Sequence, residues 1–349
     1  MLSHLWTSLA AREAARNSGI NPIAMIGAGA IVFDVGYRGT GLALTQLFAP
    51  HAHSPKSASF EVSRVASPAS PIARRGPTGF LLVHGLSGTP TELHYLAQQL
   101  EKEGHTVYCP LLDGHSGGTR TLRASRWQDW YASVERAHEK LQSVCETVIV
   151  GGSSAGGILS LILAARRPDQ VSGLLLYAPT LRLDGWAIPR SFSLFRLVTQ
   201  RWLAHYFHFS DVEPYGIKDE RVRRLAFAAI QTGTDGAQPM IGFPGTTVLE
   251  FRWLTREARR VLSKVRAPTL IIHPRDDDFS SLDGALLIQQ RLGSRVETLV
   301  LDDSYHLVAL DRQRDIVVDR TLRFVRSLES TKQTGSLEEY PPAGMATHR

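Results

Sequence analysis

The sequence predicts a protein of the α/β class, with a mostly parallel central sheet and helices on both faces of that sheet. From Phe80 onward, short apolar runs alternate with longer segments whose apolar residues recur every three or four positions. Strands that are separated by helices of about ten or more residues pair in parallel, because each helix returns the chain across the sheet. A glycine-rich turn at Gly152–Gly156 also joins one apolar run directly to a helical pattern.

The predicted elements follow one another in a regular order. The expected strands are Phe80–His84, His105–Cys109, Val148–Val150, Val171–Tyr177, Thr269–His273 and Val296–Leu301. The expected helices are Thr91–Glu103, Arg126–Val144, Ala155–Arg167, Asp283–Leu292 and Arg312–Leu328. In the first helix Leu93, Leu96 and Leu100 share one face, and Thr91 is a candidate for the N-terminal cap.

The composition is that of an ordinary globular protein. Of the 349 residues, 43% are hydrophobic and 21% are charged. The net charge of +6 is spread over many arginines without a long basic run, which argues against nucleic-acid binding. Cys109 and Cys145 lack the spacing of a metal site, so we expect buried free thiols and a reducing, cytoplasmic compartment.

Residues 1–78 are expected to form an N-terminal extension and linker. Leu2–Arg16 can form an amphipathic helix, and Ile23–Phe33 is an apolar run that is too short to span a bilayer. A packed or peripheral segment is favoured over a cleaved signal peptide, since no convincing cleavage site follows. The extension is therefore a candidate for peripheral contact with a membrane. Phe60–Ala66 is expected to be a strand, and residues 331–349 a disordered tail.

The turn between the third strand and its helix fits the pattern Gly-x-Ser-x-Gly, with Ser154 at the centre. Where this pattern joins a strand to a helix, the serine sits on a sharp, strained turn and presents its hydroxyl above the sheet. The glycines at Gly152 and Gly156 allow neighbouring backbone to approach closely. Ser154 is therefore a candidate nucleophile. The alternative is a glycine-rich turn without chemistry, because so short a motif also arises by chance.

A second glycine-rich loop, His84–Gly88, follows the first predicted strand. A His-Gly loop at this place supplies a backbone N–H group to an oxyanion hole, and the residue after the nucleophile supplies another. The two donors would be the N–H groups of Leu86 and Ala155. An ordinary turn is the alternative.

Three consecutive aspartates, Asp276–Asp278, follow the strand Thr269–His273. A carboxylate at this end of a strand can orient a histidine, but the three residues leave the choice open. A cation site is the alternative, although no glycine-punctuated calcium loop surrounds them. His306 follows the last strand, Val296–Leu301, and is a candidate general base.

Six short motifs in residues 80–328 occur together in one known group of proteins. They are His84–Pro90, Pro110–His115, Trp127–Trp130, Gly152–Gly157, Ala267–Leu270 and Tyr305–Val308. In these motifs the chain resembles the bacterial carboxylesterase and monoacylglycerol lipase group of α/β-hydrolases. The resemblance implies an α/β-hydrolase fold with a helical cap insertion.

The resemblance also assigns roles to individual residues. It places the nucleophile on Ser154 and the general base on His306. The acid of the group follows an Arg-x-Asp-x-hydrophobic pattern, which selects Asp277 from the three aspartates. The oxyanion donors fall on Leu86 and Ala155.

The chain departs from the group in two places. Ser153 and Ala155 stand where the group often has an apolar residue and methionine, which is expected to alter the pocket. The sequence His115-Ser-Gly-Gly replaces the usual Gly-His-Gly turn, so we expect a structural role for His115.

A long interruption, residues 181–262, separates the two parts of the predicted core, 79–180 and 263–330. An insertion at this place is expected to form a cap or lid over the pocket. Its aromatic side chains could line an acyl pocket or form a small core of the cap itself. The candidates for substrate binding are Trp186, Phe207 and Phe243.

Residues and resemblance together imply a serine hydrolase that cleaves carboxylic esters through an acyl-enzyme. Ser154 attacks the ester carbonyl, His306 takes its proton, and Asp277 orients His306. The expected substrate is a small-molecule acyl ester, and the mechanism requires no cofactor. No metal is expected either, because His205 and His208, which have helical metal-ligand spacing, lack a third ligand. An acyl thioesterase or acyltransferase with the same triad is the main alternative. An amidase or aminopeptidase is less favoured, and so is a non-catalytic binding scaffold.

Overall fold

The structure, a computed structural model, describes residues 33–34, 75–210, 213–232 and 242–335. The interpretations of Leu2–Arg16 and Phe60–Ala66, and most of that of Ile23–Phe33, lie outside these residues. The linker before residue 75 and the tail after residue 335 lie outside them as well.

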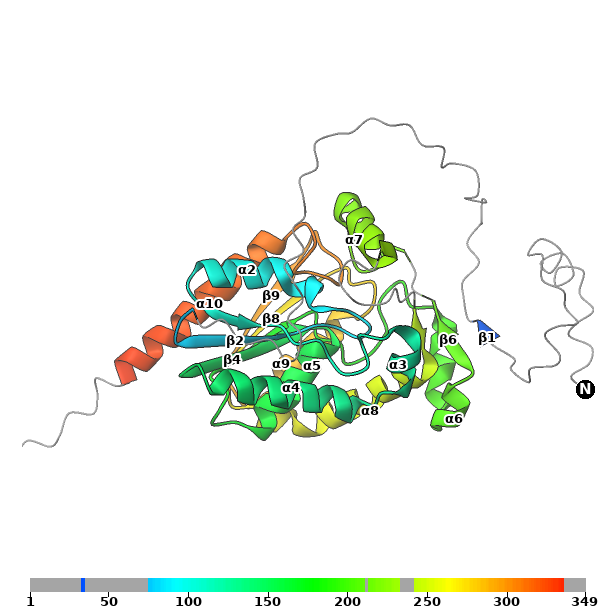
Figure 1. Cartoon of the computed structure of the whole chain (residues 1–349), viewed down its shortest axis with the longest axis horizontal. Helices are drawn as coiled ribbons and strands as arrows, with labels where there is room; N and C mark the ends of the chain where they lie inside the picture. The colour runs from blue at the N-terminus through cyan, green and yellow to red at the C-terminus, as the bar shows by residue number, and fades with distance from the viewer. Residues whose placement is uncertain (1–32, 35–74, 211–212, 233–241, 336–349) are drawn as a thin grey trace, which may run out of the picture.

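A six-stranded sheet forms the centre of the described fold, in the order β3-β2-β4-β5-β8-β9 (Figure 1). All its neighbouring strands pair in parallel, so the predicted α/β class with a parallel sheet is confirmed. The strands are β2 Thr78–Val83, β3 Thr106–Tyr108, β4 Thr147–Ser153, β5 Gly173–Tyr177, β8 Thr269–Pro274 and β9 Val296–Leu301. A smaller sheet contains β1 Phe33–Asp34, β6 Phe207–Phe209 and β7 Phe243–Pro244.

Helices cover both faces of the large sheet (Figure 1). One layer contains α2 His94–Lys102 and α10 Arg314–Gly335. The other contains α3 Gly118–Ala124, α4 Trp127–Gln142, α5 Ala155–Arg166, α8 Gly245–Val261 and α9 Leu282–Arg291. Further elements are η2 Pro90–Leu93, η3 Arg190–Leu197, α6 Arg201–Ala204, α7 Glu220–Thr232 and η4 Leu262–Lys264.

The two layers explain why the strands read as continuous apolar runs. Along β2, Leu81 and Val83 belong to the core with α4 and α5, whereas Phe80 and Leu82 pack with α2 and α10. Successive side chains of a strand point to opposite faces, so a strand that is covered on both faces is apolar throughout. This arrangement leaves the loops at the carboxyl ends of the strands to carry polar chemistry.

The largest differences between predicted and observed helix boundaries are at the start of α2 and the end of α10. Thr91 lies inside the 3₁₀ turn η2 rather than at a cap, and the α-helix begins at His94. Pro90 opens that turn, after Thr89 in an extended conformation. At the other end, α10 continues to Gly335, beyond the predicted start of the tail at residue 331.

The segment predicted as a cap, residues 181–262, contains two structurally different parts. Its last helix, α8, packs on α5, and its residues Phe251, Leu254 and Ala258 belong to the main core. The earlier residues form a separate apolar cluster around Phe195 and Phe209, together with Val248 and Leu249 from the start of α8. The helix α8 is therefore a layer of the sheet along most of its length, while its start packs with the earlier residues.

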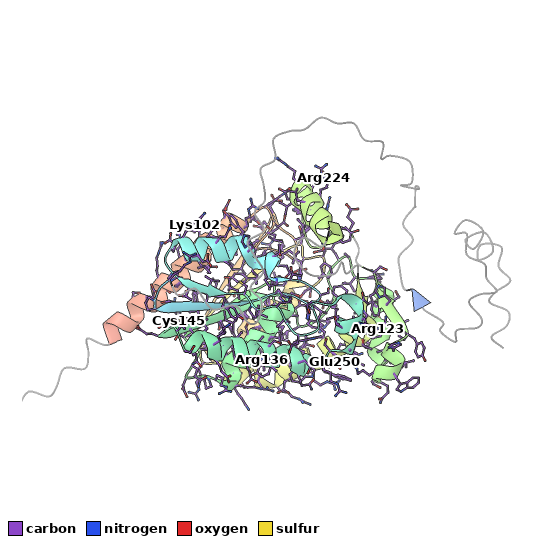
Figure 2. All side chains as sticks on the ribbon, viewed as in Figure 1. Lys102, Arg123, Arg136, Cys145, Arg224 and Glu250 are labelled. Atoms are coloured by element: carbon purple, nitrogen blue, oxygen red, sulfur yellow. The ribbon has the colours of Figure 1, made fainter. Side chains whose placement is uncertain are left out.

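Arg201 of α6 ties that earlier part to the layer beneath it. Its guanidinium forms an ion pair with the buried carboxylate of Glu250. It also donates to the carbonyls of Arg123, Ala124 and Ser125, at the end of α3. Figure 2 shows Arg123 and Glu250 on this side of the molecule.

The two cysteines are free, as predicted; Cys145 is buried and Cys109 is partly buried. None of the helices in the described part of the chain combines the length and the apolar content that crossing a bilayer requires.

Candidate active site

Ser154 stands alone between β4 and α5, in the sharp turn that the Gly-x-Ser-x-Gly pattern predicts. Its backbone has φ 52° and ψ −117°, a region that non-glycine residues rarely occupy. The turn is held because the N–H of Ser154 donates to the carbonyl of Tyr177 at 2.9 Å. A strained serine at the carboxyl end of a central strand is the geometry of a nucleophile elbow.

Close packing of backbone around the elbow requires glycine at position 156. A Cβ atom on Gly156 would lie 2.1 Å from the carbonyl oxygen of Val83 and 2.4 Å from that of His84. We expect Gly156→Ala to lower the free energy of unfolding by about 1–3 kcal/mol, because backbone rather than a flexible side chain must move. Urea denaturation measures this change.

Gly284→Ala is the matched control, since Gly284 also lies in a helix but its Cβ would have no neighbour closer than 3.8 Å. This variant should be neutral or slightly more stable than the wild type. Equal stabilities of the two variants would show that the close approach at Gly156 is not limiting.

The side chains of His306 and Asp277 meet, although His306 lies in the loop after β9 and Asp277 in the loop after β8. Nδ1 of His306 is 2.8 Å from Oδ2 and 3.0 Å from Oδ1 of Asp277. The N–H groups of Phe279 and Ser280 donate to Asp277 Oδ1 at 2.8 and 2.9 Å, which orients the carboxylate. Both side chains are buried.

The structure distinguishes the three consecutive aspartates. Asp276 is exposed, and Asp277 contacts the imidazole of His306. Asp278 is buried and accepts hydrogen bonds from the backbone N–H groups of Gly216 at 2.7 Å and His306 at 3.3 Å. Asp278 therefore holds the histidine loop against a distant segment, whereas Asp277 acts on the ring.

Electrostatics at the pair favour a protonated imidazole. Burial by itself would lower the pKa of His306, but the charge and hydrogen bond of Asp277 outweigh it and raise the pKa above its usual range. Burial opposes ionisation of Asp277, yet the neighbouring His306 holds the pKa of that carboxyl below its usual range. Each group therefore stabilises the charged form of the other.

His273 is a further neighbour of Asp277 that the sequence did not single out. Its Nε2 lies 3.1 Å from the carbonyl oxygen of Ser280 and 3.4 Å from Asp277 Oδ2. Burial lowers the pKa of His273, so the ring is neutral and donates from Nε2. The only signal for it was a polar residue near the end of an apolar strand.

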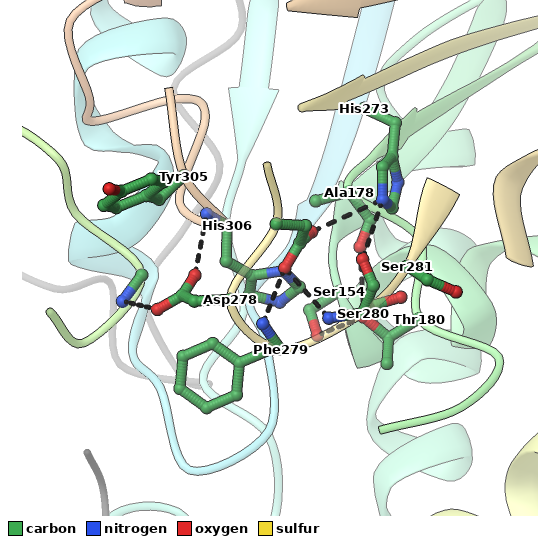
Figure 3. A network of polar contacts seen from close by, with 12 residues as sticks. Ser154, Ala178, Thr180, His273, Asp278, Phe279, Ser280, Ser281, Tyr305 and His306 are labelled. Carbon is green, nitrogen blue, oxygen red and sulfur yellow. Dashed lines mark hydrogen bonds and ion pairs between the residues drawn. The ribbon is translucent and has the colours of Figure 1, made fainter. Parts of the chain in front are cut away.

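The hydroxyl of Ser154 has a partner that the sequence did not reveal. Its Oγ is 3.2 Å from Oγ1 of Thr180, which itself donates to the carbonyl of Ala178 at 3.1 Å. Ser154 is therefore the donor in the first pair. Among the described residues no hydrogen bond joins Ser154 to His306, although both belong to the group of polar residues drawn in Figure 3. Catalytic contacts of this kind often form only when substrate binds.

The loop after β2 has the geometry of an oxyanion loop. The N–H of Gly88 donates to the carbonyl of Gly85 at 3.2 Å, and Ser87 between them has φ 55°. Nδ1 of His84 also donates to that carbonyl at 2.9 Å, because its Nε2 accepts the N–H of Leu112 at 3.1 Å. Burial lowers the pKa of His84 to about 3, so the ring stays neutral in this role.

The second predicted donor, the N–H of Ala155, belongs to the first residue of α5. The first N–H groups of a helix have no intrahelical partner and are available to an anion. His115 does not reach this region directly; it is buried with its ring against His84 and Trp130.

The three predicted substrate-binding aromatics have different surroundings. Trp186 is 58% exposed, and its indole N–H donates to the carbonyl of Asp276. Phe243 packs against Phe279, which in turn contacts the ring of His306. Phe207 packs against Phe195 in the separate apolar cluster, and Phe243 also borders that cluster. Sequence reasoning missed Phe279, which is adjacent to the aspartates.

Comparisons with known proteins identify the family of the chain. Residues 79–313 match the sequence profile of the family described as serine aminopeptidase, S33. The chain is 28% identical over 270 residues to a thermostable monoacylglycerol lipase of Bacillus sp. (strain H-257), covering 74% of this chain and 95% of that protein. It is 22% identical over 268 residues to a carboxylesterase of Bacillus subtilis (strain 168), covering 76% and 99%.

Solved structures share the fold at lower identity. A metagenome-derived lipolytic enzyme, from a study of LipS and LipT, superposes with a TM-score of 0.60 at 24% identity, over 75% of this chain and 99% of the other. A soluble variant of monoglyceride lipase from Saccharomyces cerevisiae superposes with a TM-score of 0.58 at 15% identity, over 74% and 90%. The chain therefore belongs to the serine aminopeptidase S33 family and is a serine hydrolase enzyme with the α/β-hydrolase fold.

Proposed function

We propose that the protein hydrolyses carboxylic esters of acyl groups, with Ser154 as nucleophile, His306 as general base and Asp277 as the orienting acid. One observation carries this proposal: the buried Asp277 carboxylate engages Nδ1 of His306 beside the strained turn that presents Ser154. With Nδ1 occupied, Nε2 is the nitrogen that can accept a proton.

The reaction follows from these positions in two steps. Ser154 Oγ attacks the ester carbonyl while its proton passes to Nε2 of His306, and the carbonyl oxygen becomes an alkoxide. The N–H groups of Leu86 and Ala155 are the proposed donors to that alkoxide. His306 then protonates the departing alcohol. Water attacks the acyl-enzyme in the second step, by the same proton transfers, and releases the carboxylic acid.

The choice of oxygen esters rests on the relatives. The two similar curated proteins are named a monoacylglycerol lipase and a carboxylesterase, whereas the family description names an aminopeptidase. We propose a small-molecule acyl ester as the substrate. The acid, base and nucleophile alone do not select the acyl acceptor or leaving group, because the same triad serves several of them.

A cap formed by residues before α8 is proposed to shape the substrate pocket. The segment around Gly216 borders the histidine loop: its N–H binds Asp278, and its carbonyl accepts the N–H of Leu307 at 2.8 Å. On the other side, the N–H groups of Asp184 and Gly185 donate to the carbonyl of Phe279 at 3.1 and 3.0 Å. Through these contacts the start of the segment and its middle part, around Gly216, lie next to the proposed triad residues.

A substrate panel tests the proposed activity. It contains p-nitrophenyl acyl esters and monoacylglycerols of several chain lengths, an acyl-coenzyme A thioester and an aminoacyl p-nitroanilide. We expect the largest kcat/KM on an oxygen ester and covalent labelling by a fluorophosphonate probe. A larger kcat/KM on the thioester or the anilide would identify a thioesterase or an aminopeptidase instead. If the protein is not labelled by the probe and turns over none of the substrates, it is a binding scaffold.

The pH dependence of kcat/KM should reflect the His306–Asp277 pair. His306 must be neutral to accept the serine proton, and its pKa is raised by Asp277 after opposing burial. Activity is therefore lost as the pH falls through the raised pKa, and the acidic limb should lie above about 6.5, the ordinary histidine value. Tryptophan fluorescence over the same range controls for acid unfolding. If the acidic limb lies at or below about 6.5 while the protein remains folded, the proposed pairing of His306 with Asp277 is contradicted.

A further inference from the structure

The carboxyl group of Glu92 lies against the loop His84–Gly88, which is the proposed oxyanion loop. Its Oε2 accepts the N–H of Gly85 at 2.9 Å. A Cβ atom on Gly88 would lie 1.6 Å from Oε1, and one on Gly85 would lie 3.2 Å from Oε2 and 3.4 Å from Cβ of Ser154. Both glycines of the loop therefore leave the space that this carboxyl fills.

The environment of Glu92 disfavours a charged carboxylate, and no lysine or arginine compensates for this in the described part of the chain. Within the described part of the chain, no lysine or arginine pairs with it; the facing groups are the N–H of Gly85 and the imidazole of His306. Burial raises the pKa of Glu92 to about 7, against the opposing effects of these two groups. The Glu92 side chain is partly buried, and its hydrogen bond to the N–H of Gly85 is a specific contact with the loop.

The peptide that joins Gly85 to Leu86 is held through its carbonyl oxygen. The carbonyl of Gly85 accepts hydrogen bonds from His84 and Gly88. The N–H of Leu86 belongs to the same planar peptide and points in the opposite direction. The preceding peptide, which carries the N–H of Gly85, is held by Glu92. Loss of that contact would remove one of the two anchors that fix the backbone torsions of Gly85, and with them the direction of the Leu86 N–H.

We propose that Glu92 is a positioning residue, which aims the Leu86 N–H at the developing oxyanion by holding the N–H of Gly85. This inference rests on the proposed oxyanion role of Leu86. This role requires an oxygen atom that accepts a hydrogen bond. Glutamine at position 92 should therefore preserve the function, whereas alanine should not. Since the oxyanion forms only in the transition state, misalignment should lower kcat and leave KM little changed.

The test compares Glu92→Ala and Glu92→Gln with wild type on a p-nitrophenyl ester that the wild type turns over. Loss of a whole oxyanion donor costs about 10²–10³-fold in kcat, so a misaimed donor in Glu92→Ala should cost about tenfold to a hundredfold. Glu92→Gln should stay within about threefold of wild type, because its amide oxygen can accept the same N–H. Glu101→Ala, on the following helix and half-exposed, is the matched control and should be unchanged.

A trifluoromethyl ketone inhibitor gives the readout that a merely structural role would not move. Ser154 Oγ adds to its carbonyl, the proton passes to His306, and the resulting alkoxide occupies the oxyanion site. Its inhibition constant should rise in Glu92→Ala by the same factor by which kcat/KM falls. Gly88→Ala is a second route to the same state, since its methyl group displaces the carboxyl without deleting it.

The outcomes are separable. Unchanged kcat in Glu92→Ala, a loss confined to KM, or unchanged inhibition by the ketone would overturn the role of Glu92 while the wild type remained an esterase. If Glu92→Ala does not fold, Gly88→Ala takes its place, and full activity in that variant would overturn the proposed role of Glu92. An inactive wild type would instead refute the proposed function.

Discussion

Ser154→Ala should abolish ester turnover, with kcat reduced by about 10⁴–10⁶-fold, because no other group on the elbow can form the acyl-enzyme. The fold should persist, since alanine keeps the Cβ atom and the backbone conformation of the turn is held by the bond to Tyr177. Hydrolysis of p-nitrophenyl esters by purified protein measures the loss. The fluorophosphonate probe should fail to label the variant.

The neighbouring serine supplies the matched control. Ser153 is buried at the end of β4 and precedes the positive φ angle of Ser154. Ser153→Ala should keep kcat within a few-fold of wild type and should still be labelled. Activity retained in Ser154→Ala, or lost equally in both variants, would show that the nucleophile lies elsewhere.

Asp277→Asn should reduce kcat by about 10⁴-fold, because an amide can no longer hold the imidazole in the tautomer that leaves Nε2 free to accept a proton. In the structure the carboxylate lies within hydrogen-bond distance of Nδ1 through both oxygens. The substitution changes few atoms, so the fold should be retained. Steady-state kinetics at the pH optimum of the wild type measure the effect.

The two adjacent aspartates are internal controls for that variant. Asp276→Asn should be unchanged, because the side chain is exposed. Asp278→Asn should cost less than Asp277→Asn, since Asp278 binds the backbone of Gly216 and His306 rather than the ring. Losses of the same size at Asp276 and Asp277 would mean that another carboxylate orients His306.

Much of the central fold could be predicted because local patterns were strong. The apolar runs of β2, β4 and β5 were recognisable, since both faces of these strands are buried. The helix α8 was assigned to the cap because its position in the chain, between two predicted core segments, says nothing about which layer it joins. Its packing on α5 depends on side chains that are distant in the sequence. The function of the cap itself stays a prediction.

The candidate site was predictable to the extent that each residue lies at a recognisable strand end. Ser154, the three aspartates and His306 all follow strands of one parallel sheet, whose carboxyl ends meet at one edge. Glu92 carried no such signal, and Thr180 and His273, although close to the ends of β5 and β8, were not distinguished from other polar residues there. Their importance depends on a contact with a residue far away or on a loop that folds over them.

By itself, the sequence determined the parallel sheet, the strained turn at Ser154 and the loops in which an acid and a base had to lie, because periodicity and glycine spacing are local properties of the chain. Only the tertiary structure decided which aspartate faces His306, which group holds the oxyanion loop and where α8 packs. Asp277 and Asp278 are neighbours with the same chemistry, and strand alternation and loop geometry direct one to the imidazole ring and the other to the backbone. Such directions exist only after the strands have paired, so residue identity alone does not encode them.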